Sequence, residues 1–147
     1  MKNVRLVLVA MLAMAALSST GCIFVSDDDP TAAVFHGTWS ITDAAGPSDC
    51  VTHDIDKTSF LFTGSDNEGH DELFTCADEA GDTAPLALDS YTYVVTLLQC
   101  PDATPGCPGG TSVKMSDPQE VTASVSTCDR EDGDNCVVDL PTFNFNL

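Results

Sequence analysis

Apolar and polar residues alternate with a period of two along most of the chain after Thr31, and no helical spacing is sustained. In residues 34–42, for example, Phe35, Trp39 and Ile41 fall on one face and polar side chains fall on the other. Seven stretches show this pattern: 34–42, 57–64, 71–78, 90–100, 111–115, 120–127 and 137–147. Each is predicted to be a strand.

Clusters of Gly, Pro and Asp separate these stretches and are typical of turns. About seven short strands joined by turns at fairly regular spacing predict an all-β fold, a β-sandwich over residues 32–147. Pro141 lies inside the last stretch, and proline cannot donate a hydrogen bond to a neighbouring strand. We therefore expect the last strand to lie at an edge or to contain a bulge.

The N-terminal residues have a different pattern, with Lys2 and Arg5 followed by an uncharged apolar run over 6–17. This run is shorter than the roughly 20 residues that a helix needs to cross a bilayer. A basic start, a short apolar run and small residues before a cut are typical of a secretory signal peptide, here residues 1–21.

Small residues at 18–21 end in Gly21, directly before Cys22, and this arrangement resembles the lipobox of bacterial lipoproteins. The resemblance implies cleavage before Cys22, lipid on that cysteine and membrane anchoring. The alternative is an ordinary signal peptide cut nearby, which leaves Cys22 as a thiol.

Residues 22–31 contain three consecutive aspartates and Pro30, and we interpret them as an acidic tether. Ile23 stands where an Asp in Gram-negative lipoproteins directs retention in the inner membrane, so the resemblance implies the outer membrane. The Ser and Asp residues at 26–29 are similar to surface-export signals of some lipoproteins. A periplasmic and a surface-facing location both stay open.

The chain has seven cysteines, so lipid on Cys22 leaves an even set of six for disulfides in an oxidising compartment. Because short loops lose the least entropy on closure, we favour pairing neighbours in sequence. The predicted pairs are Cys50 with Cys76, Cys100 with Cys107, and Cys128 with Cys136. No two of the six have the spacing of two to four residues that is usual for structural zinc ligands.

The net charge is −18, and all 23 acidic residues follow Cys22. Such a surface repels phosphate backbones, so nucleic-acid binding is not expected. Carboxylates are also the ligands that calcium prefers, but no acidic cluster has the spacing of an EF-hand loop. The calcium candidates are Asp66, Glu68, Asp129, Glu131, Asp132 and Asp134.

Catalytic patterns are missing from the sequence. His36, His53 and His70 are spaced seventeen apart and form no paired zinc-binding motif, and no serine lies in a nucleophile elbow. We therefore expect a protein that is not an enzyme and has no cofactor other than a candidate calcium ion. A metal-dependent enzyme using the histidines is the least favoured alternative.

Trp39, the cysteines, and Leu86 followed by Tyr91 at the start of an apolar strand together resemble immunoglobulin-like or transthyretin-like (carboxypeptidase-regulatory) domains of secreted lipoproteins. The resemblance implies an antiparallel, disulfide-stabilised sandwich. It also implies that Tyr91 caps a corner by donating a hydrogen bond to the backbone.

Such folds host many unrelated functions. The expected function is a membrane-anchored envelope module that binds a protein, peptide or envelope polymer, or that has a structural role. The alternative is a calcium-dependent binding or adhesion module.

Overall fold

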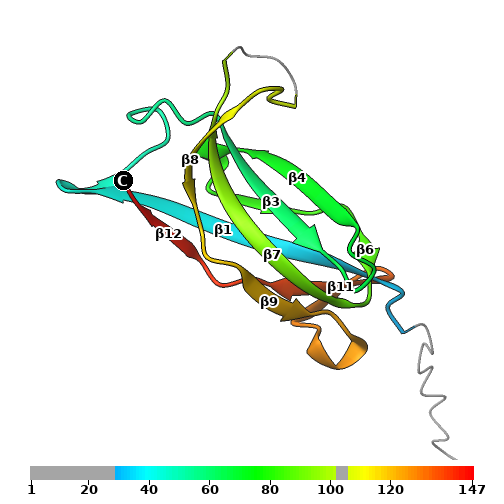
Figure 1. The fold of residues 1–147 in the computed structure, drawn as a ribbon. Coiled ribbons are helices and arrows are strands. Elements are labelled where there is room, and N and C mark those ends of the chain that lie inside the picture. Colours follow the sequence, from blue (N-terminus) through cyan, green and yellow to red (C-terminus); the bar gives the residue numbers. More distant parts are fainter. Residues whose placement is uncertain (1–28, 102–105) are drawn as a thin grey trace, which may run out of the picture.

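The longest strand, β1 (Ala32–Asp43), is the centre of one of two facing sheets in the computed structural model, which describes residues 29–101 and 106–147 (Figure 1). The predicted signal peptide, Cys22 and the tether up to residue 28 lie outside these residues. Within them, no helix is long and apolar enough to span a membrane.

Sheet one is built on both sides of β1. Three short antiparallel strands line one side: β2 (Gly46–Ser48), β5 (Ala80–Asp82) and β6 (Leu86–Ala87). Two strands pair with the other side in parallel: β11 (Asn135–Asp139) and β12 (Phe143–Asn146). The outermost strand, β10 (Arg130–Asp132), pairs with β11.

The predicted last strand is present, but it is interrupted at Pro141. His36 pairs with Asp139 and Trp39 pairs with Phe143, so the C-terminal run has one residue more than β1 over this interval. The proline thus lies at a break with a register shift beside an edge of the sheet, as its missing N–H predicts.

Sheet two is antiparallel, in the order β4-β3-β7-β8, and β9 also pairs with β7. Its strands are β3 (Lys57–Thr63), β4 (Gly69–Thr75), β7 (Ser90–Gln99), β8 (Thr111–Met115) and β9 (Gln119–Thr122). In Figure 1 this sheet lies in front of β1 and β12. The two layers confirm the predicted all-β sandwich.

The core lies between the sheets and consists mainly of the faces that the alternation predicted. The buried side chains include Phe35, Trp39, Ile41, Phe60, Phe62, Tyr91, Tyr93, Val95, Leu97 and Phe145. Aromatic rings contact one another across the sheets, as Phe35 and Phe62 do at 4.8 Å between ring centroids. Burial of these apolar surfaces is the main force that holds the layers together.

All three predicted disulfides are present: Cys50–Cys76, Cys100–Cys107 and Cys128–Cys136. The first joins the loop after β2 to the end of β4 and therefore links the two sheets. Beside it, the Trp39 indole Nε1 donates a hydrogen bond to the Cys76 carbonyl at 2.8 Å. The predicted corner is also present, because the Tyr91 hydroxyl donates to the Ala87 carbonyl at 2.8 Å.

Each of the seven predicted strands has a counterpart, but the described residues contain twelve strands. The additional ones are β2, β5, β6, β10 and the second half of the interrupted C-terminal run. Two predicted strands are too long, since β4 and β9 are followed by short 3₁₀ helices, η1 (Cys76–Asp78) and η2 (Val125–Thr127). The pairing is not wholly antiparallel either, because β1 pairs in parallel with β11 and β12.

Candidate binding surface

The three histidines come from separate parts of the fold. His36 lies on β1, with its Nδ1 2.6 Å from Asp82 Oδ1 on β5, while His70 lies on β4 in the other sheet. His53 lies in the loop between β2 and β3. Among the residues that the structure describes, no three His, Cys, Asp or Glu side chains form a group able to hold a metal ion.

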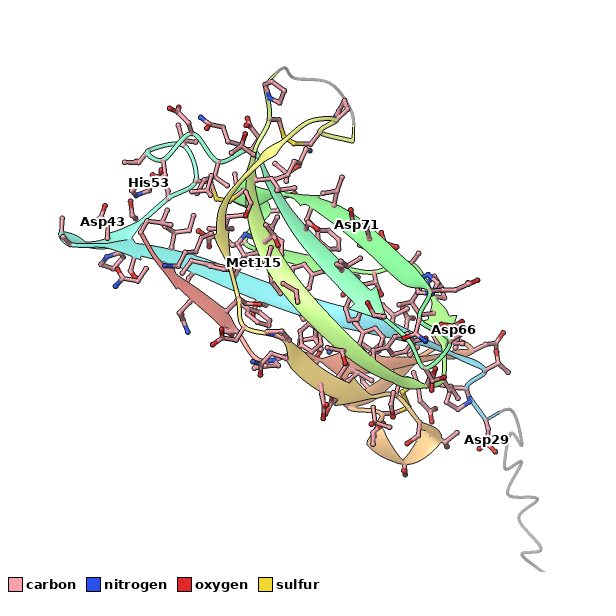
Figure 2. All side chains as sticks on the ribbon, in the orientation of Figure 1. Asp29, Asp43, His53, Asp66, Asp71 and Met115 are labelled. Carbon is pink, nitrogen blue, oxygen red and sulfur yellow. A yellow bond between two sulfur atoms is a disulfide. The ribbon has the colours of Figure 1, made fainter. Side chains whose placement is uncertain are left out.

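His53 does contact a serine and an aspartate, as Figure 2 shows for Asp43 and His53 at one end of the sandwich. Its Nε2 is 3.0 Å from Ser48 Oγ and 3.4 Å from Asp43 Oδ2. In a catalytic triad the serine and the carboxylate contact different ring nitrogens, because the aspartate orients the base from behind. Here both contact the same nitrogen, so the cluster ties the loop to the β1–β2 turn and lacks the geometry of a nucleophile.

The second oxygen of the Asp43 carboxylate also has a hydrogen-bond partner. The backbone amide of Ala45 donates to Asp43 Oδ1 at 2.7 Å. This hydrogen bond, with contributions from Ser48 and His53, lowers the pKa of Asp43 below its usual range.

The calcium candidates lie in two separate hairpins, and the side-chain contacts of Asp66 and Asp129 are made within those hairpins. Asp66 Oδ1 accepts a hydrogen bond from the Glu68 amide at 2.9 Å. Asp129 Oδ2 accepts one from the Asp139 amide at 2.8 Å, which closes the β10–β11 hairpin. Glu131, Asp132 and Asp134 lie on β10 and the turn after it. The geometry of the described residues therefore gives the calcium interpretation no support.

A more distinctive feature is the distribution of charge over sheet two. β3, β7 and β8 are neighbours in this sheet and contain none of the 23 acidic residues, whereas Lys57 and Lys114 lie on them. We call the solvent side of these three strands the acid-free face. Strands β2, β6 and β12 also lack Asp and Glu, but they have only two to four residues each.

The acid-free face is also apolar. Five large apolar side chains are exposed among the described residues, and three of them lie on β3 and β8: Leu61 (44%), Val113 (39%) and Met115 (57%). On β7, Val94 and Leu98 alternate with the buried Val95 and Leu97 and therefore point outward. Figure 2 shows Met115 at one side of this sheet and Asp71, on β4, at the other.

Beside Met115 the surface is hollowed into a groove of about 520 Å³ where the edges of the two sheets meet. Lys114, Met115, Asp117 and Gln119 line it from sheet two, and Phe143 and Asn144 line it from β12. Phe143 is only partly buried and gives the groove an aromatic wall, while Lys114, Asp117, Gln119 and Asn144 make most of its lining polar. A second hollow of about 490 Å³ lies over Val34 and Val137 in sheet one and is bordered by charged residues.

Comparison with known protein families, with curated proteins and with solved structures gives no significant match.

The acid-free face was not predicted from the sequence. Its signal was present, because residues 57–63, 90–99 and 111–115 each lack Asp and Glu in an acidic chain. What the sequence does not show is that these three stretches are adjacent in one sheet, where they merge into one surface.

Proposed function

We propose that this protein is a membrane-anchored, non-catalytic envelope lipoprotein that binds a partner protein through the acid-free face. One observation supports the binding role. Strands β3, β7 and β8 expose apolar side chains and contain no carboxylates. Lipid on Cys22 and location at the outer membrane of a Gram-negative bacterium are parts of the same proposal, supported by the lipobox-like residues.

Desolvation explains why binding belongs on this face. Burying an unpaired carboxylate costs several kcal/mol, whereas burying Leu, Val or Met side chains is favourable. The centres of protein interfaces are accordingly poor in charged residues and rich in aromatic residues and Met. A partner that covers Leu61 and Met115 covers no acidic residue of β3, β7 or β8, and Asp71, which pairs with Leu61 from β4, lies at the border of the covered surface.

Substitution of exposed apolar residues tests the binding role. The double variant Leu61→Glu/Met115→Glu places two carboxylates on the acid-free face, and both positions are exposed, so the fold should tolerate them. The matched control is Val51→Glu/Val125→Glu, at exposed positions outside the face. Complex size is measured by native electrophoresis of the detergent-solubilised protein.

We expect the unmodified protein and the control variant to migrate in a complex larger than the single chain, and the face variant to lose it. A complex that survives in the face variant, or that is lost equally in the control, contradicts the proposal. So does the lack of any complex in the unmodified protein.

The anchor is tested separately with Cys22→Ser. We expect this variant to leave the membrane fraction, because serine lacks the thiol to which the lipid is attached, and burial of the lipid chains is what holds the protein at the bilayer. If it remains there with unchanged electrophoretic mobility, the protein is not held by lipid on Cys22.

A further inference from the structure

The edges of the two sheets differ in how far they are protected against pairing with another strand. An edge strand presents unpaired N–H and C=O groups, which short length, proline or a bulge can protect. Along β7, strands β8 and β9 form an edge that is interrupted near Pro118, with a further irregularity at Leu97 and Leu98. The edge of sheet one at β12 follows the break at Pro141, and β2, β5, β6 and β10 have two or three residues each.

β4 is the exception. Its seven residues pair in continuous register with all seven residues of β3, and it contains no proline and no bulge. Its other side has no strand partner among the described residues, and Figure 1 shows it at the border of sheet two. β4 is thus the longest regular edge in the part of the chain that the structure describes.

The chain segment that contains this edge is acidic, and Lys57 on β3 pairs with Thr75 at the end of β4. Between Gly64 and Asp82 the chain has seven acidic residues and no Lys or Arg. Asp71 and Glu72 lie on β4 itself, with the Ser59 hydroxyl donating to Asp71 Oδ1 at 2.6 Å and the Ala84 amide donating to Glu72 Oε1 at 3.3 Å. These contacts fix one oxygen of each carboxylate, and the other makes no hydrogen bond with the described residues.

The acidic residues of β4 favour a cationic partner over a second copy of the chain. Two copies of the chain that met through β4 would bring Asp71 and Glu72 of each against like charges, which disfavours self-pairing. A segment rich in Lys or Arg would instead gain both backbone hydrogen bonds and charge complementarity.

We infer that the free edge of β4 binds a cationic segment of a partner protein, which adds to sheet two as an extra strand. The inference deepens the proposed binding function and depends on it. Asp71 and Leu73 on β4 point to the same side of the sheet as Leu61 on β3, so cationic side chains of the added strand that face Asp71 would lie at the border of the acid-free face.

The experiment uses a seven-residue peptide of alternating Lys and Val as the probe, with the folded domain at about 0.15 M ionic strength to limit non-specific attraction. Three probes are compared: this peptide, the same peptide N-methylated on alternate amides, and a peptide with Glu in place of Lys. Affinity is measured by fluorescence anisotropy, and hydrogen exchange of the backbone amides locates the site.

We expect the Lys peptide to bind and to protect amides of 69–75 from exchange. N-methylation removes the backbone donors while keeping the charge, so it should weaken binding by roughly tenfold or more. The variant Asp71→Asn/Glu72→Gln should also weaken binding roughly tenfold. The control Glu131→Gln/Asp132→Asn, which changes the same charge on β10, should bind like the unmodified protein.

Equal binding of the N-methylated peptide would show that charge alone attracts the probe and would overturn the strand addition. Protection at β8 or β12, equal loss in the two variants, binding of the Glu peptide, or no binding of the Lys peptide would overturn it as well. If the Lys peptide fails while Leu61→Glu/Met115→Glu still dissociates the complex, the inference fails and the proposed function stands. If the Lys peptide does not bind and Leu61→Glu/Met115→Glu keeps the complex, the proposed binding function is contradicted as well.

Discussion

Thr58 is fully buried on β3, and its hydroxyl oxygen has no hydrogen-bond partner among the described residues. A buried hydroxyl without a partner loses its hydrogen bonds to water on folding and gains nothing in return. Its neighbours across the sheet are Phe74 and Leu97, which offer only apolar side chains.

The variant Thr58→Val should therefore be more stable than the unmodified protein by about 1 kcal/mol, since it replaces the hydroxyl with a methyl group of similar size. Thermal unfolding should show a rise of about 4 °C in the melting temperature. Thr92→Val, at an exposed position on β7, is the control and should change little. A Thr58→Val variant that melts lower would mean that the hydroxyl has a stabilising partner.

Tyr91 and Tyr93 give a second test at the residue scale. Burial raises the pKa of Tyr91 above its usual value of 10.0, and the charges of Asp89 and Asp66 add to the effect. Burial alone raises the pKa of Tyr93. The folded state thus favours the protonated phenol, which Tyr91 needs in order to donate to Ala87.

This stability is fully present below the unfolded pKa of 10.0 and decreases as pH rises above it, because the unfolded chain then releases protons more readily. Urea unfolding at a series of alkaline pH values should show the decrease. The chain has two tyrosines, so an ultraviolet titration reports on these residues alone. Both phenols titrating at 10.0 in the folded protein would contradict the expectation.

At the scale of elements, two glycines decide how closely the sheets approach. Gly37 on β1 pairs with Gly81 on β5, and both face sheet two. A Cβ atom on Gly37 would overlap the Phe60 ring, and one on Gly81 would overlap the Phe74 ring. The rings thus pack directly on backbone that has no side chains.

Gly37→Ala should lower the free energy of unfolding by about 1–3 kcal/mol through overpacking. Gly69→Ala on β4 is the matched control, because its added Cβ would meet Leu61 at an ordinary 3.5 Å. Chemical denaturation of the two variants makes the comparison. Equal stability of both would show that the core adapts to the methyl group.

The alternation of side chains predicted the positions of the seven longer strands and the buried faces of β1, β3 and β7, because it records directly which residues face the core. The short strands β2, β5 and β6 could not be predicted in this way. With two or three residues each, they show no periodicity and exist because β1 is long enough to pair with several partners. The parallel return of β11 and β12 beside β1 likewise depends on contacts between the two ends of the chain.

At the scale of the whole molecule, the net charge of −18 predicted repulsion of polyanions but did not show where the surface lacks acidic residues. The position of the acid-free face is known only from the strand order β3-β7-β8, which brings together three stretches that are far apart in sequence. The disulfide pairs could be predicted from loop length alone, because each joins cysteines that follow one another in the chain.

We propose that this chain binds its partner through the acid-free face. The most direct test places a photo-crosslinking amino acid at Leu61 or, as the control, at Val51, in cells that produce the full chain. Leu61 is 44% exposed and Val51 is 78% exposed, so exposure alone favours the control. We predict a discrete crosslinked protein from Leu61 and none from Val51; crosslinks from Val51 alone, or equally from both, would contradict the account.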